Sequence, residues 1–324
     1  MTGSEASYRD RRVLVLGASG FVGRWVARAL AASGAQLQLV ARDEVAAGAV
    51  ADAYAFSGDV HVADLREPEQ AARLVKKLIP DVVFNLAGYG VDPSERDPDL
   101  AQRINAQLPE ALATELVAQR RDAKDGRPVL VHVGSALEYG DIAGDLAERS
   151  LPRPTTLYGE TKLAGTLAVQ RICSAQRVPA LTARLFTVFG PGEHAGRLFP
   201  TLCDAASTNG TIPLTVGTQQ RDFCFVEDVA TGLLRLGAAH VEPGEVVNFA
   251  CGEMTSVREF VVLAARSLGI APKRLDFGAL PTREEEMSHD AISVQRLLEL
   301  VGWKPSVNLA NAFERSHLFS SSLV

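Results

Sequence analysis

Short apolar runs alternate with longer amphipathic segments through the first half of the chain. The apolar runs are RVLVLG from residue 12, QLQLVA from 36, DVVFNLAG from 81 and PVLVHVGS from 128. Between them lie FVGRWVARALAAS, EQAARLVKKL and LPEALATELVAQ, in which apolar positions recur at helical spacing. A regular exchange of strands and crossover helices predicts a parallel sheet with helices on both faces.

The regular alternation weakens beyond residue 185, where Pro and Gly become frequent in FGPGEHAG and GTIPLTVGTQQ. We therefore expect two lobes in an α/β protein. Residues 11–184 should form a doubly wound parallel sheet of the Rossmann type, which also receives 225–251. Residues 185–324 should form a smaller, mixed α/β lobe that binds substrate, and residues 1–10 a flexible tail.

Composition and charge exclude several classes of partner. The chain has 324 residues, of which 47% are hydrophobic, enough for a substantial core, and its net charge is −6. Without a dense Lys/Arg run, we expect neither nucleic acid nor an anionic membrane as a partner. The opening MTGSEASYRD lacks the pattern of a signal peptide, and no apolar stretch reaches about 18 residues, which favours a soluble cytoplasmic protein.

Four cysteines occur, and they are widely spaced in the sequence. They show no CxxC pairing and no His-rich neighbourhood, so the sequence suggests neither a metal site nor a disulfide framework. We expect reduced thiols at Cys173, Cys203, Cys224 and Cys251.

A glycine-rich turn, GASGFVG at residues 17–23, directly follows the first apolar run and opens a helical segment. Glycines at this spacing let backbone N–H groups approach a pyrophosphate at a helix N-terminus, which predicts dinucleotide binding. Ser19 could bond a phosphate or cap the helix. The expected contacts are Gly17, Ser19, Gly20, Phe21, Val22 and Gly23.

The end of the second strand indicates which dinucleotide is bound. An acidic residue there would accept the ribose hydroxyls of NAD, whereas arginine favours the 2′-phosphate of NADP. The sequence places Ala41 and Arg42 at this point, with Asp43 one residue later. NADP(H) is therefore preferred, and NAD(H) stays open because a shift of one residue would bring Asp43 into the acid's place.

Tyr158 and Lys162 stand four residues apart in YGETK, so they share one face of a predicted helix. Ser135 ends a predicted strand. We expect these three side chains to be catalytic, with Tyr158 exchanging a proton with a substrate oxygen during hydride transfer. A neighbouring ammonium and a cationic nicotinamide would lower the pKa of Tyr158 from about 10 toward 7, a preference of roughly 4 kcal/mol for the phenolate.

Taken in order, the motifs resemble those of the extended short-chain dehydrogenase/reductases that act on nucleotide-sugars. The likeness covers nearly the whole chain, and one departure bears on the substrate contacts, where Thr187 stands for the usual Asn. The matching segments are GASGFVG, ADL at 63–65, NLAG at 85–88, GSALEYG at 134–140, YGETK, RLFTVFGPG at 184–192, QRDFCFVEDVA at 220–230, VNFACG at 247–252 and VGWKP at 301–305.

The resemblance implies further contacts, on both the cofactor and the substrate side. Toward the cofactor, the adenine would lie between Asp64 and Leu65, the ribose and nicotinamide along Leu86, Ala87 and Gly88, and the carboxamide against Leu185. Toward the substrate, it implies Ser135 and Thr187 at the sugar, and Arg221 and Arg283 at the diphosphate.

The resemblance also narrows the reaction. Sugar dehydratases of the family carry acids after the catalytic hydroxyl, where this chain has Ala136 and Leu137, so elimination is disfavoured. We expect NADPH-dependent reduction of a nucleoside-diphosphate 4-keto-6-deoxyhexose. A 4-epimerase with tightly bound NAD is the alternative, and a protein that binds NADP without chemistry is a third. Helices beginning near residues 100 and 156 would build the four-helix homodimer interface common in the family.

Overall fold

A computed structural model gives the arrangement of the chain. The structure describes residues 7–91, 94–120, 128–140, 142, 144, 146–282 and 289–321. Among these residues, no helix combines the length and apolar character that crossing a membrane requires.

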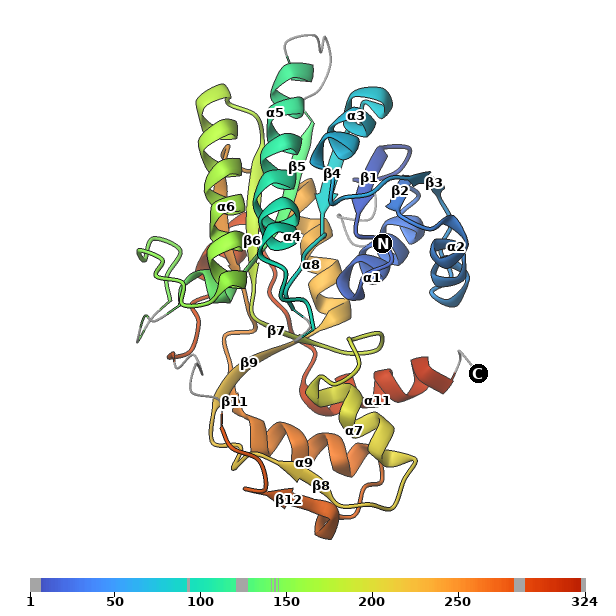
Figure 1. Ribbon diagram of the computed structural model, residues 1–324, viewed down its shortest axis with the longest axis vertical. Helices are drawn as coiled ribbons and strands as arrows, with labels where there is room; N and C mark the ends of the chain where they lie inside the picture. The colour runs from blue at the N-terminus through green and yellow to red at the C-terminus, as the bar shows by residue number, and fades with distance from the viewer. Residues whose placement is uncertain are drawn as a thin grey trace.

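Seven parallel strands form the central sheet (Figure 1). They run β3-β2-β1-β4-β5-β6-β10 across it, so the order reverses between β1 and β4. Ligands of open α/β sheets bind outside the carboxyl ends of the strands at such a reversal. The strands are β1 (Arg12–Leu16), β2 (Gln36–Ala41), β3 (Asp59–Val62), β4 (Val82–Asn85), β5 (Val129–Ser135), β6 (Ala180–Leu185) and β10 (Glu245–Phe249).

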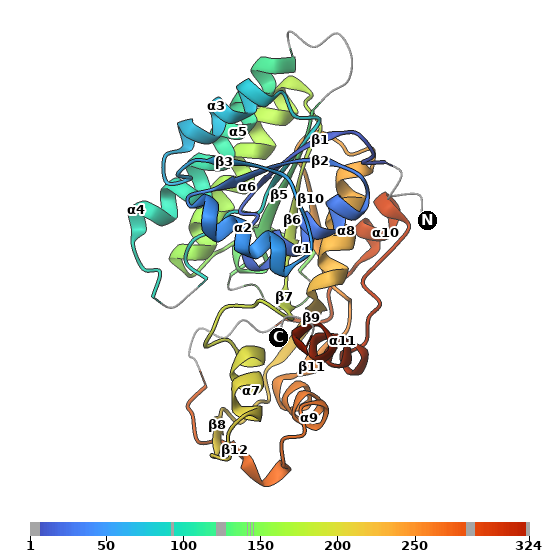
Figure 2. The ribbon, with the colours of Figure 1, turned by 90° about the vertical axis from the view of Figure 1, so that its right-hand side faces the viewer.

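Helices cover both faces of this sheet, as Figure 2 shows. Because side chains alternate along a strand, Val13 and Val15 of β1 enter one core, with α1 and α8, while Leu14 and Leu16 enter the other, with α3, α5 and α6. The predicted doubly wound α/β fold is therefore confirmed. The helices are α1 (Phe21–Ala32), α2 (Glu44–Ala53), α3 (Pro68–Leu78), α4 (Pro98–Ala101), α5 (Leu108–Arg120), α6 (Leu157–Gln176) and α8 (Val226–Ala238), with a π-helical η1 (Gln102–Gln107) joining α4 to α5.

A second group of elements lies at the carboxyl edge of the sheet, at the bottom of Figure 1. Strands β7 (Thr187–Phe189), β9 (Gln220–Phe225) and β11 (Met254–Ser256) form one small sheet, and β8 (Ile212–Leu214) pairs with β12 (Leu275–Phe277). The helices of this second group are α7 (Leu198–Ala206) and α9 (Val257–Ser267). Of two short 3-10 turns, η2 (Ala136–Glu138) follows β5 of the large sheet, and η3 (Pro272–Arg274) precedes β12. Segment 225–251 supplies α8 and β10 to the large sheet.

Helices α10 (Gln295–Val301) and α11 (Leu309–Ser321) complete the described chain. Helix α11 contacts both groups of elements through aromatic side chains. Its Phe313 packs against Phe189 and Phe260, whereas its Phe319 lies 4.7 Å, centroid to centroid, from Trp25 of α1. The C-terminal helix thus ties the small sheet to the large one.

The expected flexible tail over residues 1–10 is wrong at its described end. Tyr8 is fully buried, and its hydroxyl donates a hydrogen bond of 2.7 Å to the Leu234 carbonyl of α8. The backbone N–H of Asp10 donates to Gly34. The buried Tyr8 ring and its hydrogen bond therefore fix this segment against α8. The sequence does not indicate this, because the residues around Tyr8 are polar.

Candidate functional site

The glycine turn lies between β1 and α1, at the reversal of strand order. Gly17 has φ +78°, and a Cβ at Gly23 would lie 1.9 Å from the Gly17 carbonyl oxygen, so these positions admit only glycine without rearrangement. A Cβ on Gly17 would come within 2.9 Å of the Ala87 nitrogen, which places the turn against the end of β4. The backbone is therefore bare where a pyrophosphate would approach.

The N-terminus of α1 begins at Gly20, and no side chain caps it. The capping role considered for Ser19 is thus wrong, and its exposed hydroxyl as a phosphate ligand stays a prediction. Phe21 and Val22 open the helix and pack against the core. With no acidic residue in this first turn, the positive end of the helix dipole suits an anion.

Arg42 is exposed directly after β2, where the adenosine end of a dinucleotide would lie. The Asp43 carboxylate instead caps α2 by accepting the Ala46 N–H at 3.0 Å. Beyond β3, hydrogen bonds from Arg66 and the nearby charge of Arg42 lower the pKa of Asp64. Two guanidinium groups therefore flank this edge, while the competing acid is occupied in a helix cap.

The remaining residues expected to contact the cofactor stand at strand ends. Leu86 follows β4 and donates its N–H to Leu16 of β1 at 3.1 Å, Ala87 is partly buried, and Gly88 is exposed. Leu185 ends β6, two strands away from β4, and is buried. Leu65 follows β3 and packs against the core on the α3 face. All lie at the carboxyl edge, and their individual contacts stay predictions.

Ser135, Tyr158 and Lys162 come together at the same edge. Ser135 ends β5, and Tyr158 stands in the first turn of α6, where the Thr156 hydroxyl caps the helix by accepting the Gly159 N–H at 3.1 Å. A hydrogen bond with Ser135 acts on the Tyr158 hydroxyl. Lys162 is 1% exposed and donates a hydrogen bond to the Val133 carbonyl of β5.

The electrostatics of the pair differ from the sequence-based prediction. Burial, with the neighbouring Glu138 carboxylate, raises the pKa of Tyr158, while the Ser135 hydrogen bond opposes this. Burial lowers the pKa of Lys162 to about 8, against the opposing charge of Glu138. The expected lowering of the tyrosine pKa is wrong for the protein alone, because desolvation and the Glu138 carboxylate outweigh the Ser135 hydrogen bond and the charge of Arg197.

Glu138 is the principal residue that the sequence analysis missed. It is fully buried and forms a capping box with Ser135, whose N–H it accepts at 2.8 Å. Its second oxygen accepts a hydrogen bond of 2.8 Å from Arg184 of β6. The S-x-x-E spacing at 135–138 was the signal that could have identified it. Since both oxygens are occupied, Glu138 does not replace the acid missing at Ala136 and Leu137.

A buried polar pair lies behind Lys162. Asn85 of β4 and His132 of β5 are both fully buried, with Asn85 Nδ2 and His132 Nδ1 3.1 Å apart. Burial and the charge of Lys162 hold the pKa of His132 well below its usual range. The depressed pKa favours the neutral imidazole. This pairing could not be predicted from the sequence, because the two residues belong to different strands.

The loop before α7 also reaches the site. The positive charge of Arg197 opposes the rise in the pKa of Tyr158, which puts Arg197 within electrostatic range of the phenol. Glu193, whose carboxylate accepts a hydrogen bond of 3.4 Å from Arg197, has its pKa raised to about 7 by burial. The loop therefore brings a cation and a buried carboxyl group near the candidate site.

Thr187 and Arg221, expected to contact substrate, lie on the small sheet. Thr187 opens β7 and pairs with Phe223 of β9. Arg221, on β9, is partly buried and pairs with Thr255 of β11. Arg283 lies outside the described residues. Substrate roles for all three stay predictions.

A glycine turn at the strand reversal and a Ser/Tyr/Lys set at the same edge define the short-chain dehydrogenase/reductase class. The chain belongs to the NAD dependent epimerase/dehydratase family, whose family model matches residues 13–250. The predicted resemblance to nucleotide-sugar-modifying members of this class is confirmed.

Individual relatives cover almost the full length. The chain is 30% identical to GDP-6-deoxy-D-mannose reductase of Pseudomonas aeruginosa over 92% of this chain and 93% of that protein. It is 29% identical to dTDP-6-deoxy-L-talose 4-dehydrogenase (NAD(P)(+)) of Kitasatospora kifunensis, with 93% of each covered. Among solved structures it resembles MoeE5 in complex with UDP-glucose and NAD, with a TM-score of 0.80, 25% identity, and 96% and 99% of the two chains covered.

Proposed function

We propose that this protein reduces the 4-keto group of a nucleoside-diphosphate 4-keto-6-deoxyhexose with NADPH. The observation that carries the proposal is the placement of Ser135 at the end of β5 and of Tyr158 and Lys162 in the first turns of α6, beside the glycine turn, with burial raising the pKa of Tyr158. A protonated phenol is the state that a reduction requires, because the new hydroxyl takes up a proton. Two relatives that are named as acting on 6-deoxysugar nucleotides support the substrate class.

The residues present fit a dinucleotide. The bare backbone at Gly17 and Gly23 and the uncapped start of α1 would hold its pyrophosphate. Arg42 would bind a 2′-phosphate, since the alternative partner for ribose hydroxyls, Asp43, is occupied at the start of α2. When bound, NADPH supplies the hydride, and the protein supplies position and the proton.

Each catalytic side chain then has a separate task. Ser135 donates a hydrogen bond that orients the substrate's carbonyl oxygen, and Tyr158 donates a proton to that oxygen. Lys162, fixed by the Val133 carbonyl, holds a ribose hydroxyl and stabilises the phenolate left behind. Arg221 and Arg283 would bind the diphosphate through paired N–H groups, with Thr187 at the sugar.

The epimerase alternative has one specific observation in its favour, the similarity to a structure that holds UDP-glucose together with NAD. The two activities differ in cofactor turnover. A reductase consumes NADPH in proportion to the keto-sugar reduced, whereas an epimerase interconverts sugars with bound NAD and no net consumption.

The test is to incubate purified protein with a panel of nucleotide 4-keto-6-deoxysugars and to follow NADPH and NADH oxidation. We expect NADPH oxidation with one nucleotide, and a loss of about 10²–10⁴-fold in kcat for Tyr158→Phe with NADPH binding retained. Interconversion of nucleotide-sugars without NADPH oxidation would replace the reductase by the epimerase. Absence of both activities would refute the proposal.

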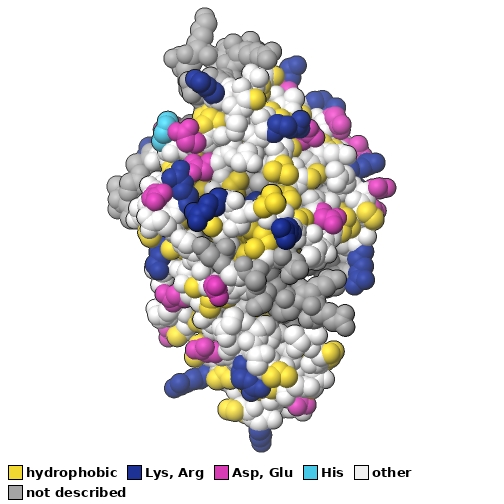
Figure 3. Space-filling view, turned by 90° about the vertical axis from the view of Figure 1, so that its left-hand side faces the viewer, with side chains coloured by type: hydrophobic (Ala, Val, Ile, Leu, Met, Phe, Trp, Pro, Cys, Tyr) yellow, Lys and Arg dark blue, Asp and Glu magenta, His cyan; other side chains and the backbone are white. Residues whose placement is uncertain are grey.

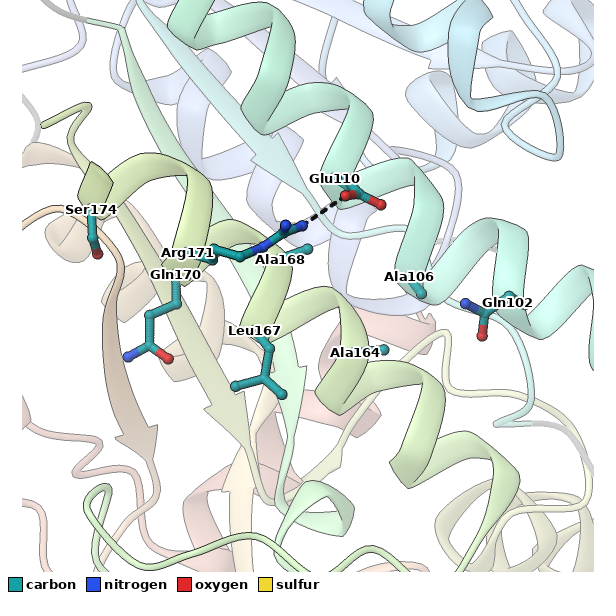
Figure 4. A pocket seen from close by; sticks show the side chains of 9 residues that line it. All are labelled: Gln102, Ala106, Glu110, Ala164, Leu167, Ala168, Gln170, Arg171 and Ser174. Atoms are coloured by element: carbon teal, nitrogen blue, oxygen red, sulfur yellow. Dashed lines mark hydrogen bonds and ion pairs between the residues drawn. The ribbon is translucent and has the colours of Figure 1, made fainter. Parts of the chain in front are cut away.

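We also propose a homodimer formed through α5 and α6. Figure 3 shows hydrophobic side chains gathered on the side of the molecule that carries α6. Figure 4 shows the residues of a hollow between α6 and the segment of η1 and the start of α5, lined by small side chains such as Ala106 and Ala164 and by Leu167, which is 50% exposed. Small residues around an exposed leucine let two helix pairs approach closely.

The dimer can be tested by sedimentation of Leu167→Glu. A charge at this position should give a monomer, whereas Val262→Glu, a similarly exposed position (48%) on α9, should leave the assembly unchanged. A wild-type monomer, or a Leu167→Glu dimer, would contradict this interface.

A further inference from the structure

Two of the four cysteines lie in contact although they are far apart in the sequence. The sulfur atoms of Cys224 and Cys251 are 3.3 Å apart. Cys224 is fully buried on β9, and Cys251 is partly exposed two residues beyond the end of β10. All four thiols are free, as expected from the sequence, but the contact between these two was not predicted.

The Asp222 carboxylate fixes this arrangement. Its Oδ1 accepts the Cys251 N–H and its Oδ2 the Gly252 N–H, each at 2.7 Å. The turn after β10 is thereby held against β9, two residues from Cys224 along the strand. These two bonds to main-chain N–H groups hold the thiols in contact. The Cys251 thiol also donates a hydrogen bond of 3.3 Å to the Phe223 carbonyl of β9.

Asp222, Cys224 and Cys251 are also the one group among the described residues that could hold a metal ion. The geometry disfavours this use. Two thiolates on one tetrahedral zinc, at about 2.3 Å from the metal, stand about 3.8 Å apart, farther than these sulfurs. Both oxygens of Asp222 are already engaged by main-chain N–H groups. A disulfide instead requires the sulfurs to approach to about 2.05 Å.

We propose that Cys224 and Cys251 are a redox-modification site that closes reversibly to an intramolecular disulfide. The oxidant is a small disulfide such as oxidised glutathione. The Cys251 thiolate, having lost its proton to solvent, attacks one sulfur, forming a mixed disulfide and releasing one glutathione thiolate. The Cys224 thiol then loses its proton, attacks Cys251 Sγ and expels the second glutathione, so two cysteines are oxidised and one glutathione disulfide is reduced.

The order of the two steps follows from exposure. The Cys251 thiol is partly exposed to solvent. The Cys224 thiol is buried, and its hydrogen bond with Cys251 and its burial raise its pKa. A buried thiol cannot meet glutathione, but it can resolve a mixed disulfide on its neighbour.

Closure would act on the small sheet. Arg221 lies next to Asp222 on β9, and drawing the two sulfurs together moves β9 relative to the turn that Asp222 holds. Resting on the proposed function, we expect the disulfide to weaken binding of a nucleoside diphosphate through Arg221, while NADPH binding at the glycine turn is unchanged.

The test uses the full-length protein, reduced and then incubated with oxidised glutathione. After thiol blocking and peptide mapping, we expect a Cys224–Cys251 cross-link and a mass about 2 Da lower than that of the reduced chain. Cys224→Ser should retain glutathione on Cys251, Cys251→Ser should take up none at Cys224, and the matched control Cys203→Ser should cross-link like the wild type.

Three results would overturn the site. The first is a wild-type protein that keeps both thiols in excess reagent, and the second is a wild-type protein that keeps a stable glutathione adduct. The third is one equivalent of zinc bound by the reduced protein and lost in Cys251→Ser. Wild-type mapping does not depend on any variant folding. Calorimetry with UDP, GDP and dTDP tests the coupling to Arg221, and a cross-linked protein with unaltered affinities would refute that coupling alone.

Discussion

Arg184 Nε lies 2.8 Å from Glu138 Oε2, and neither side chain reaches the surface. The same carboxylate accepts the Ser135 N–H and raises the pKa of Tyr158, while it opposes the lowering of the Lys162 pKa. Arg184 also stacks its guanidinium over the Tyr139 ring at 4.5 Å. One buried ion pair therefore supports the backbone and the electrostatics of the candidate catalytic residues.

We predict that Arg184→Met lowers the free energy of unfolding by about 3–5 kcal/mol at pH 7, because it leaves the Glu138 carboxylate buried without its cation. The double variant Glu138→Gln/Arg184→Met should recover part of the loss, since no charge is then stranded. Urea unfolding of the four proteins of this cycle measures both effects. Additive losses in the double variant would show that the pair is not coupled.

We predict opposite results for alanine at two helical glycines. Gly23→Ala should abolish dinucleotide binding or folding, because its Cβ would meet the Gly17 carbonyl oxygen at 1.9 Å. Gly48→Ala, in α2, meets nothing within 4 Å and should stabilise the protein by about 0.5–1 kcal/mol. Thermal unfolding with and without NADPH reports both. Normal NADPH binding by Gly23→Ala would remove the phosphate-binding role of the turn.

We predict an alkaline limit to the reaction set by Lys162. Its pKa of about 8 means that the ammonium is present below that pH and is lost above it. Because the ammonium stabilises the phenolate that forms as Tyr158 gives up its proton, kcat/KM for reduction should fall as pH rises past about 8. Lys162→Arg, although slower, should lack this limb since guanidinium stays charged. A wild-type profile flat to pH 10 would contradict the assignment.

We predict that His132 makes the protein sensitive to acid. Its pKa is depressed in the folded state, so the unfolded chain binds the additional proton. The free energy of unfolding is therefore retained above the pKa of about 6.5 that histidine has in the unfolded chain. Below that pH it falls by up to about 1.4 kcal/mol per pH unit. His132→Gln should lose this component between pH 6.5 and 5, whereas His240→Gln, exposed after α8, should not. Equal slopes in all three proteins would exclude His132 as the cause.

Site residues that lie close together in the sequence could be predicted, whereas those that meet only in the folded sheet could not. Gly17, Gly20 and Gly23 belong to one turn, and Tyr158 and Lys162 to one helix, so local spacing indicated their chemistry. Arg184 and Glu138, 46 residues apart, meet only because β5 and β6 are neighbours in the sheet.

The burial of individual side chains also could not be predicted from the sequence. A tyrosine four residues from a lysine suggests a lowered pKa, but the phenol is desolvated beside Glu138, and the pKa rises instead. Similarly, the contact between Cys224 and Cys251 depends on the Asp222 clamp, which no sequence spacing encodes. The apolar runs predicted β1, β2, β4 and β5, whereas β3, with the sequence DVHV, is too polar to stand out, and β7, β8 and β11 are three residues each, too short to show a period.

Arg42 provides the test of cofactor choice. We predict that Arg42→Ala raises the KM for NADPH about tenfold and leaves that for NADH nearly unchanged, because an exposed guanidinium would contact only the 2′-phosphate. Arg266→Ala, an equal loss of charge in the last turn of α9, controls for the change in net charge. Steady-state kinetics with both cofactors measures the ratio. If Arg42→Ala raises the KM for NADPH and for NADH equally, Arg42 attracts both cofactors by its charge and does not discriminate between them. If Asp43→Asn raises the KM for NADH alone, the acid binds ribose and the chain is an NAD enzyme.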